Sequence, residues 1–134
     1  MHQDAAGLQL LARGELDRGD AAAWVDAPVT DDFVVIVGDI LERYTNGVLR
    51  ATPHRVVRRR AARRSIIRFN AVAPDEVVAP LAAFCGSGGP KYTPVTMQKH
   101  MDTTLGNLRR GIPSWDPATN TSRSATYDYS SSHP

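Results

Sequence analysis

Five consecutive apolar residues, Phe33 to Val37, constrain the fold more than any other feature of the sequence. The run ends at Gly38-Asp39, and an apolar run of this length before turn residues is typical of a strand that is buried on both faces. Such a strand needs other segments to cover it on both sides. Further strand-like segments, separated by turn residues, lie at 2–11, 24–25, 48–57 and 65–71. We therefore expect an all-β chain, with the last two of these segments paired as a hairpin.

Two helical segments interrupt this β pattern. Asp39 is placed to cap a short helical turn over Ile40–Tyr44, and Asn46-Gly47 closes it. Thr96 opens a longer amphipathic helix that ends at Arg109-Arg110-Gly111. The apolar positions at helical spacing in this C-terminal helix are Met97, Met101, Thr104, Leu105 and Leu108, and its polar, solvated face is expected to carry His100.

Length and composition favour one small domain in a reducing compartment. A chain of 134 residues fits a single domain, and no apolar run approaches the roughly 20 residues of a membrane helix. The one cysteine, Cys85, cannot form an internal disulfide, and no secretory signal follows Met1. We expect a cytoplasmic protein that does not bind a membrane. Residues 111–134 are rich in Ser, Thr, Asn and Pro, which predicts a disordered tail after a folded domain at 1–110.

Basic charge is concentrated in one segment. Residues 50–68 carry eight arginines and no acidic residue, whereas the net charge of the whole chain is only +2. Such a segment can bind nucleic acid, but it lacks the interleaved aromatic residues on which bases stack. The alternative is a solvated connection in which one arginine points inward toward an anionic ligand.

Two histidines and an aspartate form a candidate metal site. His2 and Asp4 are two residues apart, so in a strand both side chains point to the same face and reach one ion. His54 follows much later in the chain. Two imidazoles and one carboxylate make a facial triad, which leaves three coordination positions open and suits non-haem Fe(II). From spacing alone, the alternative is three polar residues that have no common function.

The order of motifs along the chain resembles the catalytic half of the isopenicillin N synthase-like family of 2-oxoglutarate/Fe(II)-dependent dioxygenases. The matching segments are His2-Gln3-Asp4, Leu8-Gln9-Leu10-Leu11, Trp24-Val25, Phe33 to Asp39, Leu41, Thr45-Asn46-Gly47, Thr52-Pro53-His54-Arg55-Val56, Arg63-Arg64-Ser65, Phe69, and Pro90 to Thr96. The resemblance extends over residues 2–108. It implies a partial double-stranded β-helix, or jelly-roll, with a C-terminal helix.

The resemblance also implies a role for each matched site residue. His2, Asp4 and His54 would hold Fe(II), Arg63 would pair with the distal carboxylate of 2-oxoglutarate, and Ser65 would donate a hydrogen bond to it. The R-x-S spacing suits this task, because in a strand Arg63 and Ser65 share a face and a guanidinium fork matches a carboxylate. The enzyme would use O2 to oxidise a small organic substrate.

Departures from the family pattern leave alternatives open. Gln3 replaces the usual Thr of H-T-D, and Ile36 replaces the usual Asn of V-V-N-x-G-D. The long portion that precedes H-x-D in the family has no counterpart, so the dioxygenase domain is expected to be truncated at its N-terminus. The chain is then an enzyme, a non-catalytic remnant of one, or, less in keeping with the motifs, a nucleic-acid-binding module. Exposed strand edges would favour self-association.

Overall fold

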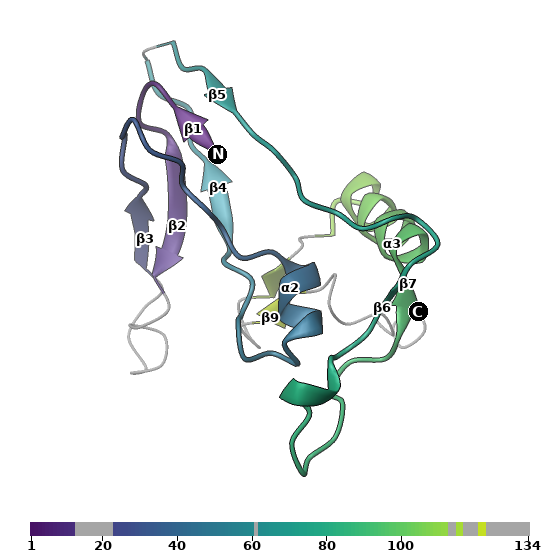
Figure 1. Ribbon diagram of the computed structural model, residues 1–134. Coiled ribbons are helices and arrows are strands. Elements are labelled where there is room, and N and C mark those ends of the chain that lie inside the picture. The colour runs from purple at the N-terminus through teal and green to yellow at the C-terminus, as the bar shows by residue number, and fades with distance from the viewer. Residues whose placement is uncertain (13–22, 61, 113–114, 117–120, 123–134) are drawn as a thin grey trace. The chain divides into compact units, whose positions relative to one another are not determined.

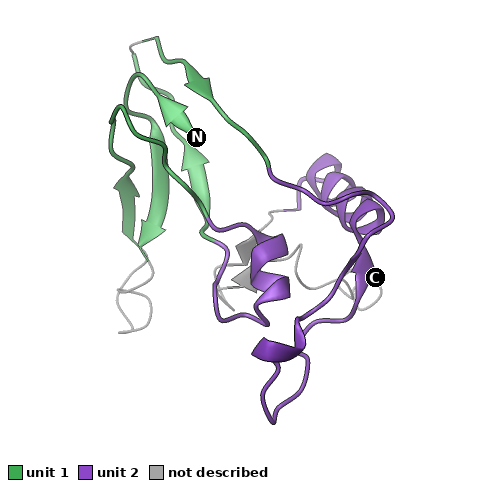
Figure 2. Cartoon of the chain, in the orientation of Figure 1, with its two compact units in different colours: residues 1–36, 52–69 green, residues 37–51, 70–134 purple. Residues whose placement is uncertain are grey.

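The computed structural model describes residues 1–12, 23–60, 62–112, 115–116 and 121–122 (Figure 1). The chain divides into two compact units (Figure 2). The first, unit 1, comprises residues 1–36 and 52–69, and the second, unit 2, comprises residues 37–51 and 70–134. The described strands are short and form small antiparallel sheets, and a helix follows them in unit 2. These features confirm a mainly β chain with a C-terminal helix.

The part of unit 1 that the structure describes forms five short strands. They are β1 (His2–Gln3), β2 (Leu8–Ala12), β3 (Ala23–Asp26), β4 (His54–Val56) and β5 (Ser65–Ile66). One sheet has the order β3-β2-β4, and β1 pairs with β5 in another. The β2 strand supplies the core of the unit, because Leu8 and Leu11 are almost fully buried. Burial of two leucines stabilises the unit by roughly 1.5–3 kcal/mol for each side chain.

The predicted hairpin between segments 48–57 and 65–71 is wrong. In the structure β4 pairs with β2, whereas β5 pairs with β1, so the arginine-rich connection joins two different sheets. The first strand also begins only at His54. Proline has no N–H to donate to a ladder, and Pro53 contributes only its carbonyl, which accepts from Leu11 N at 2.9 Å.

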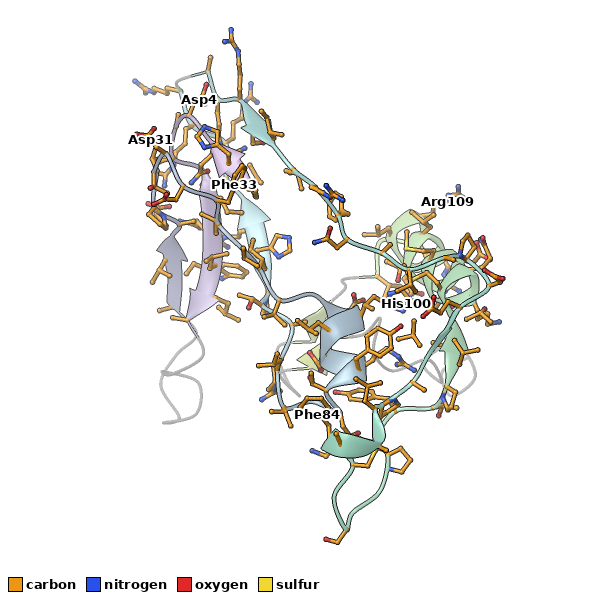
Figure 3. The ribbon with its side chains drawn as sticks, viewed as in Figure 1. Asp4, Asp31, Phe33, Phe84, His100 and Arg109 are labelled. Carbon is orange, nitrogen blue, oxygen red and sulfur yellow. The ribbon has the colours of Figure 1, made fainter. Side chains whose placement is uncertain are left out.

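The apolar run that opened the sequence analysis is not a buried strand in the structure. No strand includes Phe33–Val37 among the described residues, and the side chains of Phe33 and Val35 are 78% and 89% exposed (Figure 3). Val34 exchanges two backbone hydrogen bonds with Met1, at 2.8 and 2.9 Å. A strand acquires its burial from neighbouring segments, so an apolar sequence without such neighbours stays extended and exposed.

The described residues of unit 2 form two α-helices, one 3-10 helix and four short strands. They are α2 (Asp39–Tyr44), β6 (Val77–Val78), the 3-10 helix η1 (Ala82–Phe84), β7 (Val95–Thr96), α3 (Met97–Arg109), β8 (Trp115–Asp116) and β9 (Thr121–Ser122). The strands pair as β6 with β7 and β8 with β9. Both predicted helices are confirmed. At the start of α3, Thr96 Oγ1 accepts from Lys99 N at 3.3 Å, and after its end Gly111 has a φ of 70°.

The face of α3 that is buried differs from the predicted one. Met97, His100 and Asn107 are buried, whereas Met101, Leu105 and Leu108 are exposed. His100 is only 2% exposed, so the prediction of a solvated histidine is wrong (Figure 3). Its Nε2 lies 3.1 Å from Asp39 Oδ2, and this polar partner explains how an imidazole is accommodated in the interior.

Buried polar side chains connect α2 to the segment before β7. The Glu42 carboxylate accepts from Tyr92 Oη at 2.8 Å and from Ala51 N at 2.5 Å. Burial and the hydrogen bond to Glu42 raise the pKa of Tyr92 to about 12. Arg43, which is fully buried, donates to Thr93 O and lies over the Tyr92 ring, and burial lowers its pKa. Unit 2 is therefore held together by polar contacts as much as by apolar packing.

The end of the chain is only partly described. The predicted disordered tail at 111–134 lies largely outside the described residues, so its disorder stays a prediction. Among the described residues, no helix is long and apolar enough to cross a membrane.

Candidate metal centre

His54 is presented by β4, where it lies across from Leu10 of β2, and its side chain is exposed. Its Nδ1 lies 3.0 Å from the carbonyl oxygen of Thr52. A carbonyl can only accept a hydrogen bond, so Nδ1 is the donor in this contact. Metal-binding histidines are commonly oriented by such a contact from the other ring nitrogen to a backbone carbonyl. The contact leaves Nε2 as the ring nitrogen with which His54 can bind a metal.

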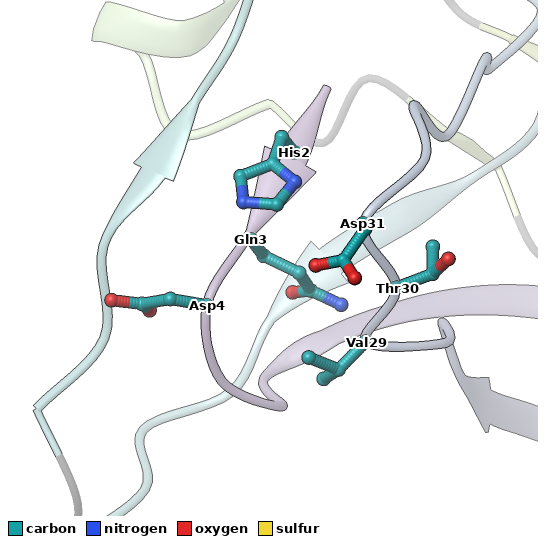
Figure 4. A pocket seen from close by; sticks show the side chains of 6 residues that line it. All are labelled: His2, Gln3, Asp4, Val29, Thr30 and Asp31. Atoms are coloured by element: carbon teal, nitrogen blue, oxygen red, sulfur yellow. The ribbon is translucent and has the colours of Figure 1, made fainter.

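His2 and Asp4 line one pocket together with Gln3, Val29, Thr30 and Asp31 (Figure 4). His2 belongs to β1, and Asp4 lies in the bend that follows it. The Asp4 side chain points toward the segment that leads into β5 (Figure 4), and its Oδ1 accepts from Arg64 N at 2.7 Å. Asp4 N in turn donates to Arg64 O at 3.2 Å. The two residues thus form a pair like that of a regular antiparallel ladder, except that the side-chain oxygen of Asp4 accepts from Arg64 N in place of its backbone oxygen. One carboxylate oxygen of Asp4 is thus held by the neighbouring strand.

The three predicted iron ligands do not converge in the structure. Among the described residues, no group of three His, Cys, Asp or Glu side chains is placed to hold a metal ion. The side chains of His2 and Asp4 belong to one pocket, but that pocket does not include His54. The joint coordination of one ion by His2, Asp4 and His54 therefore stays a prediction.

Arg63 and Ser65, the predicted anchor of 2-oxoglutarate, do lie together. Arg63 Nη1 is 3.5 Å from Ser65 Oγ. The remaining edge of the guanidinium faces Gln3, because Nε and Nη2 donate to Gln3 Oε1 at 3.2 and 3.0 Å. The arginine stem lies against Gly7, where an added Cβ would be 3.0 Å from Arg63 Cδ. The side chain of Arg63 is therefore held at both its stem and its head.

Gln3 is a site residue that the sequence analysis recorded only as a departure from the family pattern. It is 2% exposed, and its Nε2 donates to the carbonyl oxygens of Ala27 and Pro28, each at 3.2 Å. All of its polar atoms are satisfied, as a buried amide requires. Its contact with Arg63 depends on the pairing of β1 with β5, which no local sequence pattern reveals.

The register of β1 and β5 separates two groups of side chains. Gln3 lies across from Ser65, and His2 lies across from Ile66. Paired residues of an antiparallel sheet point to the same side, and successive residues alternate. Gln3 therefore shares a face with Ser65 and Arg63, while His2 projects from the other face of the same two strands.

Two other arginines of the basic segment are bound within unit 1. Arg59 forms an exposed ion pair with Asp26 at 2.9 Å. Arg55 Nε donates to Gln9 Oε1 at 2.9 Å, and its guanidinium stacks 4.2 Å from the centre of the Trp24 ring. Part of the basic charge is thus compensated by side chains of β2 and β3.

The family model that matches this chain is described as the 2OG-Fe(II) oxygenase superfamily, and the match covers residues 1–71. That range is more than half of the chain and contains every predicted site residue. The chain belongs to the 2OG-Fe(II) oxygenase superfamily. The resemblance inferred from the order of motifs is confirmed at the level of this superfamily.

Curated relatives agree with this membership. The chain is 32% identical over 105 residues to a 2-oxoglutarate-Fe(II) type oxidoreductase of Emericella nidulans, covering 72% of the chain and 30% of the relative. It is 35% identical over 122 residues to gibberellin 20 oxidase 3 of Oryza sativa, covering 87% and 32%. It is 40% identical over 80 residues to 1-aminocyclopropane-1-carboxylate oxidase 1 of a Doritaenopsis orchid, covering 58% and 22%. The chain thus spans between a fifth and a third of the length of these three relatives.

Proposed function

We propose that this chain acts in the Fe(II)- and 2-oxoglutarate-dependent oxidation of a small organic molecule. One observation carries the proposal: the superfamily match contains the whole candidate site, from His2 to Ser65. The pairing of β1 with β5 supports it, because it brings the H-x-D segment directly beside the R-x-S segment. We also propose that the short sheets form part of a jelly-roll.

The donor chemistry of the three proposed ligands suits Fe(II). His54 has its Nε2 lone pair available, since Nδ1 is engaged with Thr52 O. Asp4 offers a carboxylate and His2 a second imidazole, and two imidazoles with one carboxylate leave positions for other ligands. In binding the metal, the Asp4 carboxylate would exchange its hydrogen bond with Arg64 N for the ion. The carboxylate would give the metal a negative charge, and each imidazole would give it a lone pair.

The oxidising power belongs to the metal and its co-substrates. Fe(II) with 2-oxoglutarate and O2 supplies the oxidation of a C–H bond, and the co-substrate is converted to succinate and CO2. The task of this chain is to hold the ion with three side chains and to bind 2-oxoglutarate by its far end. A guanidinium forms paired, charge-assisted hydrogen bonds with a carboxylate, and Ser65 beside Arg63 adds a hydroxyl donor.

The experiment that tests this proposal compares two arginines of the basic segment. Arg63→Ala should remove measurable binding of 2-oxoglutarate in the presence of Fe(II), because losing a paired charge contact costs roughly 2–5 kcal/mol. Arg59→Ala is the matched control, since this exposed residue pairs with Asp26 and its charge is worth ~1 kcal/mol or less. Binding is measured by anaerobic calorimetry and turnover by the release of succinate.

Two results would contradict the proposal. Equal losses of 2-oxoglutarate binding in Arg63→Ala and Arg59→Ala would indicate a diffuse basic surface without a defined anchor. Tight binding of DNA or RNA that falls steeply with salt, together with no binding of 2-oxoglutarate, would favour the nucleic-acid-binding alternative.

A further inference from the structure

The side-chain amide of Gln3 is hydrogen-bonded to one edge of the Arg63 guanidinium. Nε and Nη2 form one of the two edges through which an arginine binds a carboxylate in a bidentate manner, and both donate to Gln3 Oε1. Hydrogen bonds from a charged donor are stronger than those from a neutral donor. Gln3 is almost completely buried, and Arg63 is half-buried, so the contact is partly removed from water.

This contact also determines where Arg63 points. Gln3 and Arg63 lie on one face of the β1–β5 pair, whereas His2 projects from the other face. A single 2-oxoglutarate molecule that binds both the metal and Arg63 needs these groups on the same side. The Nε–Nη2 edge of the guanidinium must leave Gln3 before this edge can bind a carboxylate of the co-substrate.

We propose that Gln3 is an intramolecular competitor for Arg63 and thereby sets the affinity for 2-oxoglutarate. This inference rests on the proposed function. The apparent dissociation constant of the co-substrate is the intrinsic constant divided by the fraction of molecules in which Arg63 is released. Because Gln3 lies between His2 and Asp4 in the chain, the competitor is built into the metal-binding segment itself.

Two substitutions at Gln3 form a matched pair. Gln3→Met keeps a side chain of similar length but offers no acceptor to Arg63. Gln3→Glu keeps the acceptor and adds a negative charge, which strengthens the hold on Arg63. Both variants lose the two hydrogen bonds that Gln3 Nε2 donates to Ala27 O and Pro28 O. The two variants share that structural loss, and in Gln3→Glu a carboxylate oxygen in addition faces the two carbonyl oxygens, so the unfolding of both variants is measured beside their binding.

The first readout is 2-oxoglutarate binding by anaerobic calorimetry on the Fe(II)-loaded chain. Gln3→Met should lower the apparent dissociation constant about tenfold, and Gln3→Glu should raise it about tenfold. Equal effects in the two variants would show that Gln3 only packs, and weaker binding in Gln3→Met than in Gln3→Glu would show that it positions Arg63. Either result overturns the competition.

The second readout needs neither metal nor co-substrate. Arg63 should react faster with phenylglyoxal, an arginine-specific reagent, in Gln3→Met than in the parent, and slowest in Gln3→Glu, as followed by peptide mass spectrometry. Exposed Arg58 is the internal standard, and its rate should not change. A different order of rates at Arg63 overturns the inference alone. If no variant binds 2-oxoglutarate at all, the proposed function fails and the competition fails with it.

Discussion

Polar residues are used differently in the two units. In unit 1 the proposed ligands Asp4 and His54 are exposed, and Arg63 is half-buried. In unit 2 Glu42, Arg43 and several other polar side chains are buried. The exposed residues of unit 1 can meet a ligand, whereas the buried residues of unit 2 already have their hydrogen-bond partners within the unit.

The motifs that match the family are of two kinds, and the two kinds lie in different units. The T-N-G and K-Y-x-P-V-T segments contact each other in unit 2, where Asn46 bonds to Gly89 O and Lys91 N, and Tyr92 bonds to Glu42. Asn46 also has a φ of 52°, a conformation that Asn tolerates better than most residues. These motifs stabilise the fold. The H-x-D, His54 and R-x-S motifs of unit 1 instead carry the proposed chemistry.

The largest expected effect is on the stability of unit 2. Arg43→Ala should lower the free energy of unfolding by about 3–5 kcal/mol, because it removes one member of a buried charged network and leaves a cavity. The matched control is Arg58→Ala in unit 1, an exposed position where a change within about 0.5 kcal/mol is expected. Denaturant unfolding measures both. Similar losses in the two variants would remove the distinction between the units.

A smaller effect is expected at Tyr92. Tyr92→Phe removes the hydrogen bond from Tyr92 to the Glu42 carboxylate and leaves the one from Ala51 N. We therefore expect the free energy of unfolding to fall by about 1–3 kcal/mol at neutral pH. The parent should also lose stability between pH 10 and pH 12. In that range the unfolded chain releases the phenol proton, while the folded chain, with its pKa raised to about 12, retains it. In unfolding curves recorded across this range the fall should be smaller in Tyr92→Phe, where the raised pKa of the Tyr44 phenol still contributes to it, and an identical fall in the variant would refute the assignment.

The smallest effect is expected at the exposed ion pair of unit 1. Arg59→Ala should change the free energy of unfolding by about 0–1 kcal/mol, since Arg59 and Asp26 are both roughly half exposed. The difference should shrink further in high salt. A loss as large as that of Arg43→Ala would show that unit 1 also depends on its polar contacts.

Local sequence signals predicted the helices of this protein well. The Asn46-Gly47 end of α2 and the Thr96 start of α3 depend on capping chemistry that acts over a few residues. The strand around Trp24 was found for the same reason, because its pattern is local. The motif order also identified the superfamily, and it predicts the residues of the candidate site.

Long-range contacts could not be read from the sequence. Phe33–Val37 has the composition of a buried strand, but burial depends on neighbours that composition does not specify. His100 was placed on the solvated face because its partner, Asp39, is far away in the chain. The contact of Gln3 with Arg63 spans 60 positions and follows only from the pairing of β1 with β5.

Anaerobic titration with Fe(II) tests most directly whether unit 1 carries the chemistry. The parent, Asp4→Ala and His54→Ala are compared by calorimetry, with Asp32→Ala as a matched control because Asp32 is exposed and contacts only Thr30 among the hydrogen bonds described for it. We predict a single Fe(II) site in the parent and in Asp32→Ala, and its loss in Asp4→Ala and in His54→Ala. Fe(II) binding that is undiminished in both Asp4→Ala and His54→Ala would contradict the assignment of the metal centre to unit 1.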